Sequence, residues 1–287
     1  MDDKRIQYFQ SELLSWYRQE NRDLPWRQTN DPYAIWISEV MLQQTQVKTV
    51  IPYFNRFMQA FPTVQNLASA EQDSVLKLWE GLGYYARARN LHKAAKKIVD
   101  EFGGVFPKTL EDVKSLPGIG EYTAAAIMSI VYGANSAVVD GNVVRVLSRV
   151  ELLRIDPKST LGKNEFAATA DRFLAHGDAG DYNQAIMELG ATICKPRRPQ
   201  CLLCPVAEVC KARHEQVQHE LPVKRKPGER PHKHIAIALV WKDGRILIDK
   251  RDAEKMLGGL WEFPGGKIEE NETAEAAVVR EIKEESG

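Results

Sequence analysis

The stretch that decides the fold is Leu116-Pro117-Gly118-Ile119-Gly120-Glu121-Tyr122-Thr123-Ala124. Gly118 and Gly120 allow backbone N–H groups in a tight turn to come close to a phosphate. A helix that follows the turn adds the positive end of its dipole. An ordinary turn between helices is the alternative, and Gly-x-Gly alone would favour it. The surrounding residues favour a helix-hairpin-helix that contacts a nucleic-acid backbone without reading its sequence.

Helical patterns lie on both sides of this hairpin, through the first two hundred residues. Apolar residues recur at helical spacing from Ile6 to Tyr17. We expect a long helix from Tyr33 to about Val50 with Asp31 as its N-cap, and a next helix that Pro52 opens. Further helices are predicted over residues 74–82, 86–102, 110–114, 122–132, 143–150, 163–174 and 182–193. The body of the chain is therefore predicted to be mainly α-helical.

The pattern changes after residue 221. Residues 223–231 are rich in proline and charge and predict a linker between a first domain, 1–222, and a second, 232–287. Strand-type runs cover 235–241, 246–248 and 261–263, with a tight turn at Asp243-Gly244, and a helix is predicted over 273–285. Three strands and one helix make a small core, so we interpret the second domain as incomplete.

Composition and charge limit the class of protein only broadly. The chain is 44% hydrophobic and 27% charged, which is ordinary for a globular protein. Its net charge is zero, but twelve acids and seven bases in residues 243–287 leave a basic body, which is compatible with phosphate binding. We see no apolar run that could span a bilayer and no secretory signal, so we expect a cytoplasmic protein without a membrane partner.

All four cysteines lie close together, with the spacing Cys194-x6-Cys201-x2-Cys204-x5-Cys210. This density in a chain that looks cytosolic indicates a metal site rather than disulfides. Four thiolates can hold a [4Fe–4S] cluster. Zinc usually takes two close cysteine pairs, and only one close pair is present. A [4Fe–4S] cluster in the loop 194–210 is therefore favoured over zinc and over unligated cysteines.

A carboxylate stands where an apolar run meets the predicted start of a helix, in Val138-Val139-Asp140-Gly141-Asn142. Asp140 can cap that helix and remain ionised in its field. Capping is also the purely structural interpretation. The two interpretations are compatible, because a capping carboxylate is held in place.

The hairpin, the cysteine spacing and the Val-Asp-Gly-Asn segment together resemble the endonuclease III superfamily of helix-hairpin-helix DNA glycosylases. Residues 1 to about 222 resemble its MutY-type adenine glycosylases through Leu24–Arg27, Ser38–Thr45, Trp79–Tyr85 and Asn183–Ala185. The resemblance implies a six-helix barrel domain and an iron–sulfur helical domain, followed by a partial α+β Nudix-like domain. It also implies a monomer that acts in base excision repair on double-stranded DNA with adenine opposite 8-oxoguanine or guanine.

The resemblance implies roles for four residues in catalysis. Glu39 resembles the general acid that protonates adenine, and Asp140 the carboxylate that stabilises the cationic sugar. Tyr122 and Asn142 resemble the residues that position Glu39 and Asp140. Glu39 lies among apolar neighbours, which should raise its pKa, whereas the alternative is an exposed helix acid. Two carboxyls that act in opposite protonation states need different surroundings.

Four further residues match positions that contact the substrate. Arg27 and Gln184 resemble parts of the adenine pocket, while Gln44 and Tyr84 resemble groups that enter the base stack. Tyr84 could instead be a core aromatic residue.

Tyr122 decides the subtype of the reaction. Relatives that also cut the strand carry a lysine at this position, which forms a Schiff base with the sugar. A tyrosine cannot do so, and we therefore expect hydrolysis to an abasic site without lyase activity. A bifunctional glycosylase/AP lyase and a non-catalytic DNA-binding module are the weaker alternatives.

The C-terminal segment Gly266-x5-Glu272-x7-Arg280-Glu281-Ile282-x-Glu284-Glu285-x-Gly287 matches the Nudix box. The glutamates of this box bind Mg²⁺ in Nudix hydrolases, so a nucleotide pyrophosphohydrolase is an alternative function. MutY-type proteins usually lack an intact box and use the domain to recognise 8-oxoguanine. A solvated acidic helix face is the favoured interpretation of these glutamates. We expect the strands that would contact 8-oxoguanine to be missing.

Overall fold

The computed structural model describes residues 2–223, 231–251 and 258–286. The chain divides into two compact units, residues 1–83 with 87–225 and residues 84–86 with 226–287. The predicted linker at 223–231 lies almost entirely outside the described residues. No described helix has the length and apolar character needed to cross a membrane.

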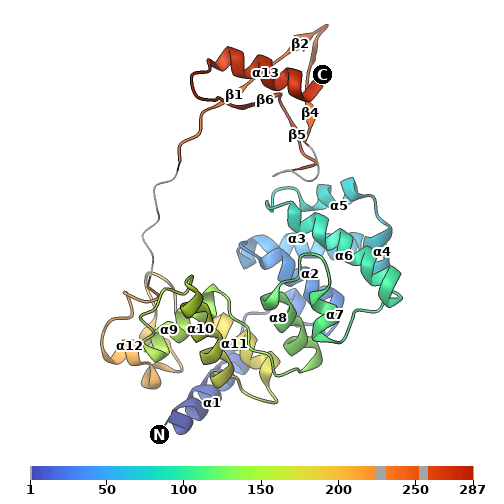
Figure 1. The fold of residues 1–287 in the computed structure, drawn as a ribbon. Coiled ribbons are helices and arrows are strands. Elements are labelled where there is room, and N and C mark those ends of the chain that lie inside the picture. Colours follow the sequence, from blue (N-terminus) through green and yellow to red (C-terminus); the bar gives the residue numbers. More distant parts are fainter. Residues whose placement is uncertain (1, 224–230, 252–257, 287) are drawn as a thin grey trace. The chain divides into compact units, whose positions relative to one another are not determined.

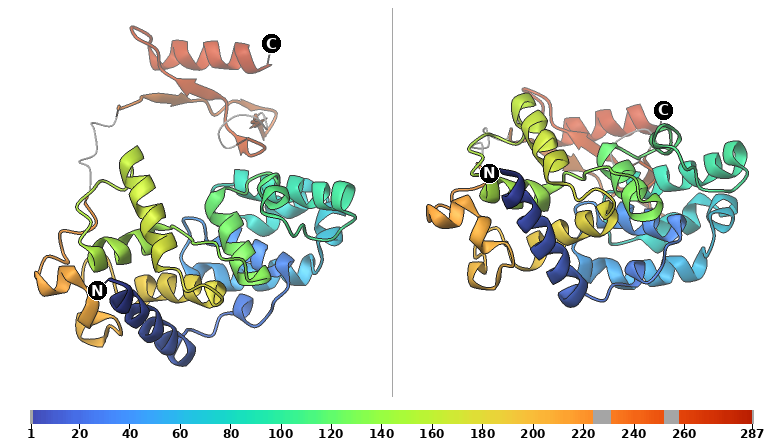
Figure 2. Two further views of the ribbon diagram at one scale, coloured as in Figure 1. Left: turned by 60° about the horizontal axis from the view of Figure 1, so that its bottom comes forward. Right: turned by 90° about the horizontal axis from the view of Figure 1, so that it is seen from below.

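The first unit is helical, and Figure 1 shows its helices in two groups. One group contains α2 (Pro32–Leu42), α3 (Val47–Ala60), α4 (Val64–Ser69), α5 (Gln72–Trp79), α6 (Ala86–Phe102), α7 (Leu110–Lys114) and α8 (Glu121–Tyr132). The other contains α1 (Asp2–Glu20), α9 (Gly141–Glu151), α10 (Thr160–Phe173), α11 (Ala179–Thr192) and α12 (Lys211–His214). Short 3-10 turns are η1 (Pro25–Arg27), η2 (Cys201–Leu203) and η3 (Ala207–Val209). Two further views in Figure 2 show the same grouping.

Helix α11 joins the two groups, because it packs against α1 and α9 of its own group and against α8 of the other group. Its group has a core in which Phe9 and Phe173 stack edge to face at 5.1 Å. In the other group Phe57 contacts Trp79 edge to face, and both side chains are fully buried. Burial of one such side chain contributes about 1.5–3 kcal/mol. Because each group buries aromatic side chains of this kind, each group has a core of its own.

Most predicted helices are confirmed, but the helix predicted over 33–50 is wrong. Ala86–Phe102 and Leu110–Lys114 form as predicted, and Asp31 caps α2 by accepting from the backbone N–H of Tyr33. The chain breaks between α2 and α3 because Gln44 takes a left-handed conformation with φ 56°. Pro52 consequently lies inside α3 and does not begin it.

The second unit contains short strands and one helix. Three antiparallel pairs form: β1 (Ile235–Ile237) with β6 (Gly265–Lys267), β2 (Trp241–Lys242) with β3 (Arg245–Ile246), and β4 (Asp249–Lys250) with β5 (Trp261–Glu262). The predicted turn is confirmed, since Asp243 and Gly244 join β2 to β3 with φ 50° and 73°, as a type I′ hairpin requires. Helix α13 (Ala274–Ser286) follows and packs against β1 and β6.

Candidate active site and cysteine cavity

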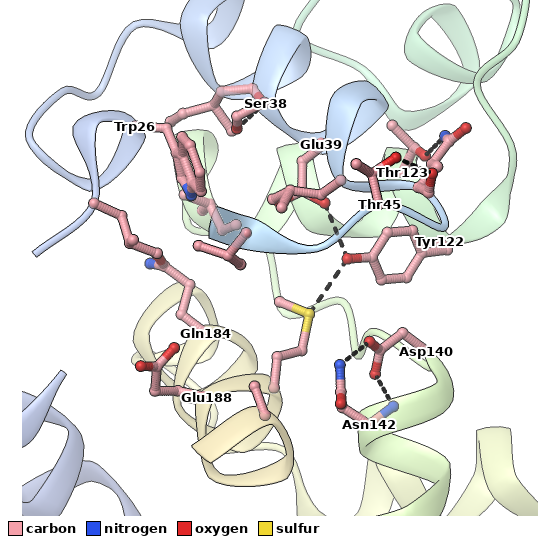
Figure 3. Close-up of a pocket in the computed structure, with 18 of the residues that line it drawn as sticks. Trp26, Ser38, Glu39, Thr45, Tyr122, Thr123, Asp140, Asn142, Gln184 and Glu188 are labelled. Carbon is pink, nitrogen blue, oxygen red and sulfur yellow. Dashed lines mark hydrogen bonds between the residues drawn. The ribbon is translucent and has the colours of Figure 1, made fainter. Parts of the chain in front are cut away.

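A cavity of about 640 Å³ lies where the two helix groups of the first unit meet. Its walls come from η1, α2, the N-terminal turns of α8 and α9, and α11, as Figure 3 shows in part. The volume lies in the range of small-molecule sites. Seven of the eight sequence-predicted catalytic and substrate-contacting residues line it: Arg27, Glu39, Gln44, Tyr122, Asp140, Asn142 and Gln184.

Glu39 is buried in the wall of this cavity. It projects from α2 with only 6% of its surface exposed, so the alternative of an exposed helix acid is wrong. The hydroxyl of Tyr122, from α8, donates a hydrogen bond of 2.9 Å to Glu39 Oε2. Burial raises the pKa of Glu39 to about 7, and the Tyr122 hydrogen bond opposes that rise. A carboxyl with this pKa can hold a proton near neutral pH and release it.

Asp140 lines the same cavity from the N-terminus of α9. Its carboxylate accepts from the backbone N–H groups of Asn142 and Val143 at 2.8 and 2.7 Å and from Asn142 Nδ2 at 2.7 Å. The predicted capping role is confirmed. Burial raises the pKa of Asp140, and these three hydrogen bonds act against the rise because they stabilise the anion.

The Tyr122 hydroxyl has two partners, Glu39 Oε2 and Met187 Sδ, and Figure 3 marks its hydrogen bond to Glu39 with a dashed line. The distance from this hydroxyl to Met187 Sδ is 3.3 Å. Burial raises the pKa of Tyr122 well above its usual value, so the phenol stays protonated and can donate to Glu39. Met187 had no signal in the sequence, because a methionine on an amphipathic helix reads as core.

Arg27 lies at another wall of the cavity and is held by Glu188. Arg27 Nη2 donates to Glu188 Oε2 at 2.9 Å, and Arg22 donates to both carboxylate oxygens of Glu188 at 2.5 and 2.7 Å. Burial alone would raise the pKa of Glu188, but the two arginines lower it. Gln184 lies one turn earlier on α11 and lines the same wall. Sequence reasoning missed Glu188, because its partners are more than 160 positions away.

Gln44 and Tyr84 share an uncommon backbone conformation. Both are non-glycine residues with a left-handed φ, 56° and 51°. Gln44 is exposed at the edge of the cavity. Tyr84 is 59% exposed, so the alternative that it is a core residue is wrong. Tyr84 is not one of the described residues that line the cavity.

The predicted hairpin connects α7 to α8. Gly118 has a φ of +81°, and a Cβ at this position would come within 2.8 Å of Asn90 Cβ. Gly120 is the N-cap of α8, and a Cβ added there would meet open space. The space beside the Gly120 Cα, at the N-terminus of α8, is therefore open.

The four cysteines line one small cavity beside α9. Cys194 follows α11, Cys201 opens η2, and Cys210 is the N-cap of α12. Among the described residues, no three His, Cys, Asp or Glu side chains are arranged to hold a metal ion. The buried guanidinium of Arg149 donates to Cys194 Sγ at 3.2 Å. A charged donor that points at a sulfur fits a thiolate ligand set.

The Nudix-box residues are partly engaged with one another. Arg280 donates to both oxygens of Glu272, each at 2.9 Å, and to Glu281 at 2.8 Å. A Cβ on Gly266 would collide with the Glu281 carboxyl, so this flexible side chain would have to move. The side chain of Glu285 and all of Gly287 lie outside the described part.

Two family models match the chain. Residues 37–168 match the HhH-GPD superfamily of base excision DNA repair proteins, and residues 236–287 match the NUDIX domain.

Proteins named adenine DNA glycosylase are similar over nearly the whole chain. The Homo sapiens protein is 39% identical, covering 100% of this chain and 62% of its own length. The Mus musculus protein is 41% identical, with coverages of 96% and 64%. The chain thus spans a little over three fifths of the length of these mammalian relatives. The protein of Buchnera aphidicola subsp. Schizaphis graminum is 36% identical, covering 90% of this chain and 75% of its own length.

Two solved structures are similar in fold to about three quarters of this chain. A thermostable thymine-DNA glycosylase superposes with a TM-score of 0.68 at 28% identity, covering 75% of this chain and 99% of that one. Endonuclease III in a non-covalent DNA complex superposes with a TM-score of 0.64 at 23% identity, covering 75% and 98%, a likeness of fold alone. The predicted helix-hairpin-helix glycosylase fold is confirmed.

Proposed function

Because the chain belongs to the adenine DNA glycosylase family of the HhH-GPD superfamily and carries a NUDIX domain, we propose that it excises adenine mispaired with 8-oxoguanine or guanine from double-stranded DNA. The observation that supports this most is a pair of carboxyls, the buried Glu39 of α2 and the half-buried Asp140 at the start of α9, that line one cavity. Excision of a base by hydrolysis needs a proton donor and an anion on opposite sides of the bond that breaks.

In the proposed reaction Glu39 donates its proton to N7 of the adenine. The bond between N9 and the sugar C1′ then breaks, and its electron pair leaves with the neutral base. Positive charge develops on the sugar, and the Asp140 carboxylate stabilises it. Water adds to C1′ and loses a proton to a carboxylate, which gives an abasic site and free adenine. A pKa of about 7 leaves much of Glu39 protonated at neutral pH.

Positioning follows from the hydrogen bonds already described. Tyr122 holds the Glu39 carboxyl in the cavity, and Asn142 fixes one oxygen of Asp140. Tyr122 also stands where a Schiff-base lysine would be needed for strand cleavage. We therefore propose a monofunctional glycosylase.

Recognition of the DNA involves the remaining predicted residues. Arg27 and Gln184 line the wall on which an extruded adenine would lie, and Gln44 and Tyr84 would fill the gap that it leaves. Gly118 and Gly120 would let the hairpin contact a phosphate. Lys195, Arg197 and Arg198 are exposed beside the cysteines and can contact further phosphates, whereas Lys211 pairs with Glu151 at 3.0 Å.

For the cysteines we propose a [4Fe–4S] cluster held by Cys194, Cys201, Cys204 and Cys210. Its support is the shared cavity and the Arg149 hydrogen bond to Cys194 Sγ. When bound, the cluster would cross-link the loop 194–210 and supply a redox-active centre. We also propose the sequence-based division into a glycosylase domain (1–222), a linker (223–231) and a Nudix-like domain (232–287).

A gel assay tests the activity. Duplexes with adenine opposite 8-oxoguanine, guanine or cytosine are incubated with the protein, and alkali with heat then cleaves any abasic site. We expect cleavage at the adenine opposite 8-oxoguanine and guanine. Glu39→Gln keeps the shape of the side chain but cannot donate the proton, so it should abolish cleavage while duplex binding persists. Full activity in Glu39→Gln would remove Glu39 from the reaction.

A further inference from the structure

We propose that Arg87 is a positioning residue that joins the loops carrying Gln44 and Tyr84, so that both loops meet DNA as one preformed unit. Arg87 is the second residue of α6 and reaches back to two segments that precede it in the chain. The inference rests on the proposed function, because it concerns how that glycosylase prepares for base extrusion.

The hydrogen bonds of Arg87 divide between two segments. Nη1 donates to the carbonyl oxygens of Val40, Met41 and Gln43 at 2.9, 3.0 and 2.6 Å. Nη2 donates to the carbonyl oxygens of Leu82 and Gly83 at 3.3 and 3.2 Å. It also contacts Thr45 Oγ1 at 3.3 Å. One guanidinium therefore connects the residues around Gln44 with the two residues that precede Tyr84.

The acceptors in the first segment are carbonyls left over at the end of α2. The last carbonyls of a helix lack an N–H partner within the helix, and a cation at a helix C-terminus is favourable. Because Arg87 satisfies the carbonyls of Val40, Met41 and Gln43, the chain can leave the helix at Gln43. Arg87 thus stabilises the break that separates α2 from α3.

The conformation of the two loops gives an independent reason for such a connection. Left-handed backbone at a non-glycine residue is unfavourable and persists only where the surroundings enforce it. Gln44 and Tyr84 both have this conformation, and each follows a carbonyl that accepts from Arg87. Strained conformations of this kind concentrate at functional sites.

Arg87 is itself fixed by a buried aromatic side chain. Its guanidinium lies 5.3 Å from the ring centroid of Trp79, which is fully buried. Trp79 Nε1 donates to the carbonyl of Gly83 at 3.2 Å, so the second segment is held from both sides. A lysine could keep the charge but has no planar fork to connect two segments.

The consequence for function lies in base extrusion. Loops that are ordered before binding lose less conformational entropy when they enter the base stack. Arg87 is absent from the groups that shift the pKa of Glu39, which are Tyr122, Asp140 and Arg27 besides burial. Its loss should therefore slow the alignment of the adenine without altering the acidity of the general acid.

The test compares Arg87→Lys and Arg87→Met with Lys96→Met, which removes an exposed charge from the same helix. Hydrogen exchange on the free protein reports order in both loops without DNA. We expect faster exchange at residues 43–45 and at 83–85 together in both Arg87 variants, and no change in Lys96→Met. Faster exchange in one loop only, or in neither, would overturn the connection.

Single-turnover excision of adenine opposite 8-oxoguanine supplies the functional readout. We expect Arg87→Lys to be about tenfold slower, because one lost hydrogen bond to a charged group corresponds to that order of rate. The pH at which the rate declines should stay that of the wild type. An unchanged rate, or a shifted decline, would overturn the positioning role. If the wild type excises no adenine, the proposed function fails, while the exchange experiment still decides whether Arg87 joins the loops.

Discussion

Replacing Tyr122 with phenylalanine should raise the pKa of Glu39 further and move the alkaline decline of excision to higher pH. Tyr122 donates a hydrogen bond of 2.9 Å to Glu39 Oε2, which stabilises the anion. Without it the carboxyl remains buried and loses the hydrogen bond that opposes the rise in its pKa. A general acid must be protonated, so activity persists below its pKa and declines as the pH rises through it.

The size of the shift follows from the kind of hydrogen bond. A hydrogen bond to a charged group contributes about 1.5 kcal/mol at the lower end of its range, and 1.36 kcal/mol corresponds to one pKa unit. The decline should therefore move from a pKa of about 7 to roughly 8. At pH 8 the protonated fraction of Glu39 would then increase about fivefold.

The assay is the single-turnover excision rate on a duplex with adenine opposite 8-oxoguanine, measured across the pH range and normalised to the acidic plateau. Met187→Leu serves as the matched control, because it removes the other contact of the Tyr122 hydroxyl at nearly constant volume. The excision rate of Met187→Leu at the acidic plateau can change, but the pH at which its rate declines should be that of the wild type. A decline in Tyr122→Phe at the wild-type pH, or below it, would refute the assignment of the decline to Glu39.

Three other predictions concern other parts of the molecule. Borohydride should trap no covalent complex between the wild type and its substrate DNA, because Tyr122 cannot form a Schiff base; efficient trapping would indicate a lyase. Purified protein should be yellow-brown and contain iron, and Cys204→Ser should lower the iron content measured by metal analysis; an iron-free wild type would refute the cluster. In denaturant titrations, Gly118→Ala should lower the free energy of unfolding by about 1–2 kcal/mol, because Gly118 has a positive φ. Gly120→Ala should change the free energy of unfolding by no more than about 0.5 kcal/mol. Equal losses in the two variants would contradict this account.

The helical unit could be predicted because its signals are local. The caps at Asp31 and Asp140 and the turn at Asp243-Gly244 each depend on residues within four positions of one another. The carboxyl of Glu39 could be placed in a buried position because most residues around it in the sequence are apolar. Such features depend on backbone geometry and short-range pattern, which a sequence displays directly.

Features that depend on distant partners were not predicted. The break after α2 was missed because the group that satisfies its carbonyls, Arg87, lies more than forty positions away. Glu188 reads as an ordinary acid on α11, and only the fold brings Arg22 and Arg27 to it. In both cases a charged side chain and its partners lie on separate elements, so no local spacing can indicate the pair.

The two carboxyls of the cavity show how one site can separate two acidities. Burial raises the pKa of both Glu39 and Asp140, so burial alone cannot assign opposite roles to them. They differ in hydrogen bonding: Glu39 accepts one hydrogen bond from a phenol, whereas Asp140 accepts three N–H donors. Donors stabilise the anion, so Asp140 is the better carboxylate and Glu39 the better acid. Asp140 receives two of its three donors from the backbone of the helix that it caps. The N-cap geometry that makes Asp140 look like an ordinary structural residue in the sequence therefore also stabilises the carboxylate that would face the sugar cation.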